Sequence, residues 1–178
     1  RIKTVSGGEL EVIQKLGEGG QGVVYKVNYN GKSLALKWYF GNKLSNADKF
    51  YRNIQNNIKQ GAPTNAFLWP LEITEYFEGS FGYLMELRPP EYKDFSLFLL
   101  AKVHFANIEA LINTALCITN GFRELHNRGY SYQDLNDGNF FVNPKTGDVL
   151  ICDNDNVAPY GENLGIAGKC RYMAPEVV

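Results

Sequence analysis

Residues 16–29 read LGEGGQGVVYKVNY, with glycine at positions 17, 19 and 22 and a run of β-branched and aromatic residues directly after them. Glycine lets the backbone bend closely over a ligand, because no Cβ blocks the approach of its N–H groups. A dinucleotide-binding fold would place a helix after such a loop, whereas Val23–Tyr29 is typical of a strand. The stretch predicts a hairpin of Glu9–Leu16 and Val23–Tyr29 that covers phosphates, or else a glycine-rich hairpin without a ligand.

The pattern continues as a small antiparallel sheet with one helix. Asn30-Gly31 predicts a tight hairpin turn, because both positions tolerate positive φ. The helix has apolar residues on one face at Phe50, Ile54 and Ile58. Arg88-Pro89-Pro90 then interrupts regular structure and is interpreted as a hinge. The elements expected before it are a strand at Ser33–Tyr39, a helix at Asn46–Gln60, and strands at Glu72–Phe77 and Phe81–Leu87.

The second half is predicted to be more helical. A short helix is expected at Ser96–Val103, and a long one at Ile108–His126, where apolar residues form a stripe from Ile108 to Leu125. Two short strands, Phe140–Asn143 and Val149–Cys152, follow it. The fold class is therefore predicted to be α+β, with a β-rich small lobe at residues 1–87 and part of a helical lobe at residues 88–178.

Composition excludes some classes of function. The chain has 178 residues, 44% of them hydrophobic, with a net charge of −1. Such a balance gives no electrostatic basis for binding nucleic acid, and no apolar run is long enough for a membrane span. The three cysteines, at positions 117, 152 and 170, form no CxxC pair and are interpreted as reduced thiols of a cytoplasmic protein.

The chemistry is concentrated in residues 132–139, which read YQDLNDGN. Asp134 can accept a hydroxyl proton, and Asn139, five residues later, can hold a metal ion on phosphates. Asp153 follows the apolar run at residues 149–152, where a second metal-binding carboxylate is expected. A lysine inside a strand, Lys37, is either a cation that contacts phosphates or an edge residue whose amine reaches water.

Five signals in this order resemble the eukaryotic-type protein kinase family, over the stretch from Glu9 to Glu176. They are the G-x-G-x-x-G-x-V loop, Ala35-Leu36-Lys37, D-x-x-x-x-N at residues 134–139, Asp153, and Ala174-Pro175-Glu176. The resemblance implies a bilobal kinase-like fold and transfer of the ATP γ-phosphate to Ser or Thr hydroxyls of a protein. It also leads us to expect a longer polypeptide, since kinases of this family continue after this last motif. The departures from the family's motifs are more typical of a divergent bacterial member than of an animal signalling kinase.

The resemblance assigns roles to individual residues. Asp134 would be the catalytic base, and Asn139 and Asp153 would bind Mg²⁺. Lys37 would pair with the α- and β-phosphates. Met85 would guard the back of the adenine pocket or simply fill the core. The residues expected to contact ATP are Leu16, Gly17, Gly19, Gly22, Val24, Ala35, Lys37, Met85, Glu86 and Leu87.

The chain departs from the family at several of these positions. No glutamate lies between Glu18 and Glu72, so the usual acidic partner of Lys37 is missing, and Asn53 is the favoured substitute. Asn136 replaces the catalytic-loop lysine, and Lys169 is hypothesised to supply the lost charge from the activation segment, unless it is only an exposed loop lysine. Gln133 replaces an arginine that normally binds an activation-loop phosphate. Asp153-Asn154-Asp155 stands where the family has D-F-G.

Three functions remain open at this point. The first is an atypical Ser/Thr protein kinase that uses MgATP. The second is a pseudokinase, favoured by the missing Lys, Glu and Phe, which would bind ATP or a partner without transfer. The third is a small-molecule kinase of similar fold, which the glycine-rich loop and the Ala174-Pro175-Glu176 motif disfavour. Nucleotide binding without phosphotransfer would identify the second.

Overall fold

The computed structural model describes residues 2–41, 44, 46–166 and 168–175. The chain folds into two compact units. The N-terminal unit comprises Arg1–Gly61 and Trp69–Leu87, and the C-terminal unit comprises Ala62–Leu68 and Arg88–Val178. Each unit contains its own β-structure. Glu176, predicted to end the last sequence motif, lies outside the described residues.

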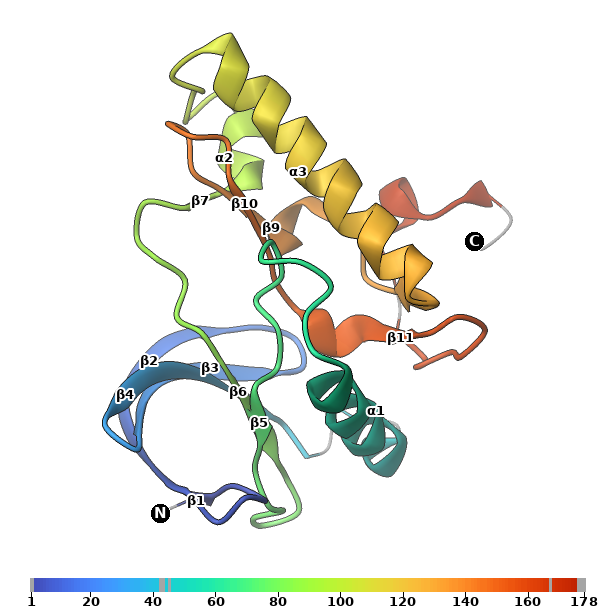
Figure 1. Ribbon diagram of the computed structural model, residues 1–178. Helices are drawn as coiled ribbons and strands as arrows, with labels where there is room; N and C mark the ends of the chain where they lie inside the picture. The colour runs from blue at the N-terminus through green and yellow to red at the C-terminus, as the bar shows by residue number, and fades with distance from the viewer. Residues whose placement is uncertain (1, 42–43, 45, 167, 176–178) are drawn as a thin grey trace. The chain divides into compact units, whose positions relative to one another are not determined.

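A six-stranded, curled antiparallel sheet forms most of the N-terminal unit (Figure 1). Its strand order is β1-β2-β3-β4-β6-β5. Helix α1 lies beside the sheet (Figure 1). The predicted turn is confirmed, because Asn30 has φ 51° and Gly31 φ 83° between β3 and β4. The elements are β1 (Ile2–Lys3), β2 (Glu9–Glu18), β3 (Gly22–Tyr29), β4 (Lys32–Tyr39), α1 (Ala47–Gln60), β5 (Glu72–Ile73) and β6 (Gly82–Met85).

Both faces of this sheet carry a core. On one face the buried side chains of Leu10, Val27, Leu34, Leu36 and Leu84 pack together. On the other face, the Tyr39 ring lies edge-on to Phe50 of α1, with their centroids 5.5 Å apart. Burying one large aliphatic side chain contributes about 1.5–3 kcal/mol, so these contacts fix the register of the strands.

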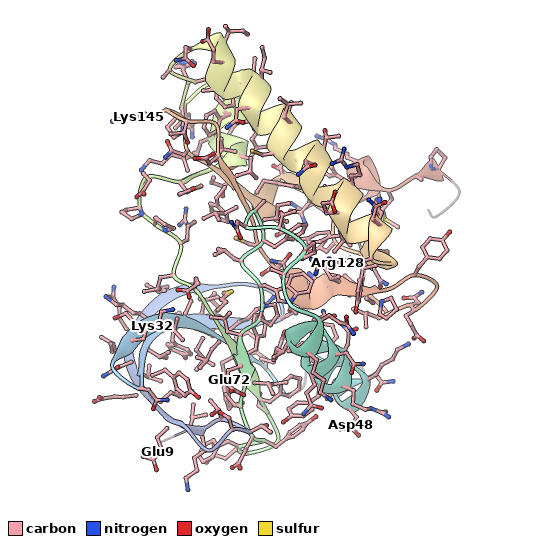
Figure 2. The ribbon with its side chains drawn as sticks, in the orientation of Figure 1. Glu9, Lys32, Asp48, Glu72, Arg128 and Lys145 are labelled. Carbon is pink, nitrogen blue, oxygen red and sulfur yellow. The ribbon has the colours of Figure 1, made fainter. Side chains whose placement is uncertain are left out.

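The C-terminal unit is built around a long helix and short strands. Strands β10, β9 and β7 form one small sheet, and β11 pairs with β8 in another. The elements are β7 (Lys93–Asp94), α2 (Phe95–Leu99), α3 (Ile108–Asn127), β8 (Tyr130–Tyr132), β9 (Phe140–Val142), β10 (Val149–Ile151) and β11 (Val157–Pro159). Figure 2 shows Lys145 near the N-terminal end of α3 and Arg128 at its C-terminal end.

Several predicted elements are shorter in the structure, among them one helix and one strand of the two units. The helix expected at Ser96–Val103 ends at Leu99, because Ala101 adopts a left-handed conformation with φ 52°. The strand expected at Glu72–Phe77 is reduced to β5, and Thr74 makes only an isolated bridge with Thr4. The overall α+β class is confirmed, since a β-rich unit is joined to one that contains the long helix α3.

The helix predicted at Ile108–His126 is confirmed as α3, but most of the apolar stripe expected on it is not buried. Its buried residues are Ala110, Thr114, Gly121 and Leu125. The turn between β9 and β10 approaches so closely that a Cβ on Gly147 would lie 2.0 Å from the Ala110 carbonyl oxygen. Small residues therefore make this contact. The larger Leu111, Ile112 and Leu116 are exposed in the part of the chain that the structure describes.

Candidate active site

The glycine-rich loop is a tight connection between β2 and β3. Gly17 pairs with Val24, and the Gly19 N–H donates to the Gly22 carbonyl at 2.9 Å. Gly22 is required by packing, because a Cβ there would lie 2.2 Å from the Trp38 carbonyl oxygen. At Gly17 and Gly19, in contrast, a Cβ would meet nothing within 4 Å. Packing against neighbouring residues therefore does not account for these two glycines, and their backbone is open to approach.

The strand register places four of the predicted nucleotide-binding residues on one face of the sheet. Val24 lies opposite Lys37, and Ala35 lies opposite Met85. Ala35 and Lys37 are two residues apart in one strand, so their side chains point to the same side. Lys37 is only 6% exposed, with its Nζ 5.7 Å from the centroid of the Tyr39 ring. Cationic side chains are rarely buried to this extent unless they are paired.

The other nucleotide residues lie near the ends of strands in the same unit. Leu16, in β2, is 48% exposed. Glu86 and Leu87 follow the end of β6, and the Glu86 carboxylate forms an ion pair with Lys32 at 2.6 Å. Asn53, the predicted partner of Lys37, is buried on α1. Its contact with Lys37 stays a prediction.

A cavity of about 800 Å³ opens on the opposite face of this sheet. Its lining includes Tyr25, Leu36 and Trp38. These side chains alternate along β3 and β4 with Val24, Ala35 and Lys37, so they point the other way. The cavity is therefore separate from the predicted nucleotide-binding face.

In the C-terminal unit, two asparagine amides hold Asp134. Asn136 Nδ2 donates to the Asp134 carbonyl oxygen at 3.0 Å and to its carboxylate Oδ1 at 3.1 Å. Asn139 Nδ2 donates to the same carbonyl at 2.8 Å and to carboxylate Oδ2 at 3.3 Å. Asn136 Oδ1 also accepts from the Gly138 N–H, which caps the short 3-10 turn at Asp137–Asn139. Asp134 is thereby oriented from both carboxylate oxygens.

The two predicted metal ligands are linked through the backbone. The Cys152 N–H, next to Asp153, donates to the Asn139 carbonyl at 2.8 Å. Asp153 has φ 51° and ψ 44°, an uncommon conformation for a residue other than glycine and one that is often found at functional sites. Asn139 donates through Nδ2 to Asp134, and its Oδ1 is the atom suited to a cation. An amide oxygen and a carboxylate are the donors that Mg²⁺ prefers, so the residues fit this ion.

A larger metal centre is not seen. In the described ranges, no three His, Cys, Asp or Glu side chains are grouped to hold an ion. Mg²⁺ is commonly bound by one or two side chains together with phosphate oxygens and water. Asn139 and Asp153 therefore suffice only if a phosphate ligand supplies further oxygens.

Polar side chains surround Asp153, where the resembling family has the phenylalanine of D-F-G and this chain has Asn154. Asn154 is fully buried, and its Nδ2 donates to the Leu68 and Ile151 carbonyls, each at 2.8 Å. Tyr132 donates through its hydroxyl to the Cys152 carbonyl at 2.5 Å. Burial raises the pKa of Tyr132 well above its ordinary value, and the charge of Asp153 adds to this. Both side chains thus fix the backbone around Asp153 through hydrogen bonds.

The segment after Asp153 also reaches the catalytic loop. Lys169 Nζ lies 3.5 Å from Asp137 Oδ1. Burial acts to raise the pKa of Asp137, but hydrogen bonds from its own backbone and from Tyr172, with the charge of Lys169, outweigh it, so the pKa is lowered. The hypothesised substitute cation, Lys169, therefore contacts the loop that contains Asp134. Its partner, Asp137, follows Asp134 by three residues.

Sequence reasoning missed the structural roles of Gln133 and Asn154. Both positions were noted only as losses of a family residue, an arginine and a phenylalanine. Their hydrogen bonds run to backbone groups 31 and 86 residues away, respectively. The partners of both side chains are distant in sequence, and no local pattern in the chain indicates these contacts.

Comparison with known proteins bears on the fold. The family model for the protein kinase domain matches residues 10–178, which confirms the predicted kinase-like fold. The serine/threonine-protein kinase PRR2 of Saccharomyces cerevisiae is 29% identical over 182 residues, covering 95% of this chain and 25% of the yeast protein. A protein kinase and PP2C-like domain-containing protein of Arabidopsis thaliana is 23% identical over 197 residues, covering 94% of this chain and 28% of its own length. The chain thus spans about a quarter of these relatives.

Proposed function

Because the chain belongs to the protein kinase domain family, we propose that it transfers the γ-phosphate of ATP to Ser or Thr hydroxyls of a protein substrate. The observation that carries the proposal is the fixing of Asp134 by Asn136 and Asn139. A carboxylate held from both oxygens is prepared to orient a hydroxyl and to accept its proton. The yeast relative, named as a serine/threonine kinase, favours this acceptor class.

The remaining residues receive roles in the same reaction. Lys37 contacts the α- and β-phosphates, and the glycines at 17, 19 and 22 present backbone N–H groups to them. Asn139 and Asp153 would hold Mg²⁺, which would supply positive charge to neutralise the charge that develops during transfer. Lys169, paired with Asp137, supplies a cation close to the catalytic loop in place of the lysine that Asn136 replaces. Adenine contacts the stretch from Met85 to Leu87.

The test is transfer of labelled γ-phosphate from ATP to a generic protein substrate in the presence of Mg²⁺. It uses the longest natural polypeptide that contains these residues, beside residues 1–178. We expect Asp134→Asn to lower transfer by at least about 100-fold, the usual contribution of a positioned base, while ATP still binds. Asn143→Ala, on the turn between β9 and β10, serves as the control. Equal transfer by the parent and by Asp134→Asn would refute the proposal.

A pseudokinase is the second candidate, and one observation favours it. Asn136 is 5% exposed, with its amide engaged by Asp134 and Gly138, so this position offers no cation for transfer. The two candidates differ in a direct measurement. ATP binding that depends on Lys37, without transfer by any polypeptide that contains these residues, would identify a pseudokinase.

A further inference from the structure

Gln133 bonds to one stretch of the activation segment, the chain that follows Asp153, with both ends of its side-chain amide. Its Nε2 donates to the Glu162 carbonyl oxygen. Its Oε1 accepts from the Leu164 N–H at 3.0 Å. Leu164 is buried, whereas Glu162 is exposed. The amide therefore holds two successive peptide groups, 162–163 and 163–164. The described residues between β11 and the turn at residues 170–172 form no helix or strand.

The fold brings this stretch back to Gln133. Strand β11 pairs with β8, and the Gln133 N–H donates to the Asn156 carbonyl at 3.0 Å. The chain then reverses at Pro159–Glu162, where the Glu162 N–H donates to the Pro159 carbonyl at 3.0 Å. Gly161 has φ 87°, the conformation that a type II turn requires at its third position. The turn thus returns residues 162–164 to the amide of Gln133.

The chemistry of the amide differs from that of the arginine expected at this position. A guanidinium is charged, has donors only and suits a phosphate group. A neutral amide has donors and an acceptor, so it can pair with a peptide carbonyl and a peptide N–H together. The segment from Asp153 to Glu176 contains no Ser or Thr that could carry a phosphate opposite residue 133.

We propose that Gln133 is a positioning residue that holds residues 162–164 in place without phosphorylation of the activation segment. The consequence for regulation rests on the proposed kinase function, whereas the two hydrogen bonds do not. Lys169 and Asp137 make a second link between the segment and the catalytic loop. A segment held at both points keeps Lys169 beside the loop in the unmodified protein.

The test replaces one or both bonding ends of the amide without changing the length of the side chain. Gln133→Met removes both bonds, and Gln133→Glu keeps the acceptor for the Leu164 N–H but loses the donor to Glu162. Gln60→Met, at the exposed end of α1, is the matched control. Amide hydrogen exchange at Leu164 is measured in the longest natural polypeptide, without nucleotide and after phosphatase treatment.

We expect Gln133→Met to speed exchange at Leu164 by about tenfold, the loss of one ordinary hydrogen bond, with a smaller change in Gln133→Glu. Phosphatase treatment should leave the parent's exchange unchanged, and amides of β9 should be unaffected by all variants. Unchanged exchange in Gln133→Met, or faster exchange in the parent after phosphatase treatment, would overturn the proposal. In the active parent, Gln133→Met should lower kcat with little change in the KM for ATP. A parent without transfer would refute the kinase function while exchange still decides the role of Gln133.

Discussion

The side-chain amide of Asn139 bonds to Asp134 twice, to its backbone carbonyl at 2.8 Å and to its carboxylate Oδ2 at 3.3 Å. The predicted base and the predicted metal ligand are therefore one hydrogen-bonded unit. Since the Asn139 carbonyl also accepts from the Cys152 N–H, the unit extends to the residue next to Asp153. A change at Asn139 should affect both proton acceptance and metal binding.

Replacement of Asn139 should separate these two effects. Asn139→Ala removes the metal ligand and the donor, and we expect turnover to fall about 100- to 1,000-fold with a higher Mg²⁺ requirement. Asn139→Asp keeps an oxygen for Mg²⁺ but places a second carboxylate beside Asp134. Its turnover should fall while its Mg²⁺ requirement stays near that of the parent. Turnover titrated against Mg²⁺ measures both, with Asn143→Ala as the control. A normal Mg²⁺ requirement in Asn139→Ala would contradict the assignment.

The sequence predicts those features that depend on local spacing. The hairpin at Asn30-Gly31 follows from the positive φ that only a few residues tolerate, and the structure has it. The five-residue spacing of Asp134 and Asn139 is likewise local, and one short 3-10 turn brings their side chains together. Strands β7, β8 and β11, of two or three residues, were not predicted, because so short a segment shows no clear period.

Features set by distant partners were not predictable. The amide of Asn154 bonds to Leu68, which is 86 residues away in sequence, and nothing near Asn154 marks that contact. The apolar stripe on α3 was misjudged for a related reason. The face that packs in this structure is chosen by a close approach of the turn at Gly147, which favours small residues over large ones.

Asn154 should contribute to stability more than to chemistry. Asn154→Ala leaves the buried carbonyls of Leu68 and Ile151 without these donors, and we expect the free energy of unfolding to fall by about 1–3 kcal/mol. Asn154→Phe, which restores the family's residue, should not recover this loss, because a phenyl ring donates no hydrogen bond. Urea unfolding gives the values, with the exposed Asn120→Ala as the control. A Phe variant more stable than the parent would show that packing, not hydrogen bonding, governs this position.

Tyr132 should make stability depend on alkaline pH. At pH 8, Tyr132→Phe loses the hydrogen bond to the Cys152 carbonyl. Its free energy of unfolding should be about 0.5–1.5 kcal/mol lower than that of the parent. The folded pKa of Tyr132 lies well above its ordinary value of about 10, so the unfolded chain releases this proton first as pH rises. The contribution of Tyr132 to the free energy of unfolding is therefore complete below the unfolded pKa of about 10. It is lost as the pH rises from there towards the folded pKa.

Urea unfolding of the parent and of Tyr132→Phe between pH 8 and about 10.5 checks this expectation, and the difference between them should narrow as pH rises. Tyr160→Phe is the control for general effects of tyrosine ionisation, because Tyr160 is 86% exposed. Its difference from the parent should stay small throughout. A gap for Tyr132→Phe that is constant over the whole range would contradict a raised pKa at this site.

Lys169 should matter for turnover and little for folding. The Lys169–Asp137 pair is partly exposed, at 58% and 26% of the two side chains, so its removal should change the free energy of unfolding by less than about 1 kcal/mol. Turnover should nevertheless fall roughly tenfold in Lys169→Ala, because a cation near the transferred phosphoryl group stabilises the charge that develops there. Lys169→Arg should keep most of the activity.

Asp137 distinguishes a catalytic cation from an ordinary surface lysine. If Asp137 acts by holding Lys169, then Asp137→Asn combined with Lys169→Ala should lose no more turnover than Lys169→Ala alone. Lys145→Ala, on the turn beside the N-terminal end of α3, removes an exposed lysine elsewhere in the same unit and should have no effect (Figure 2). Turnover with saturating ATP is the measurement. Full activity in Lys169→Ala, while Asp134→Asn is inactive, would show that Asp134 functions without this cation and that Lys169 only ties the activation segment to Asp137.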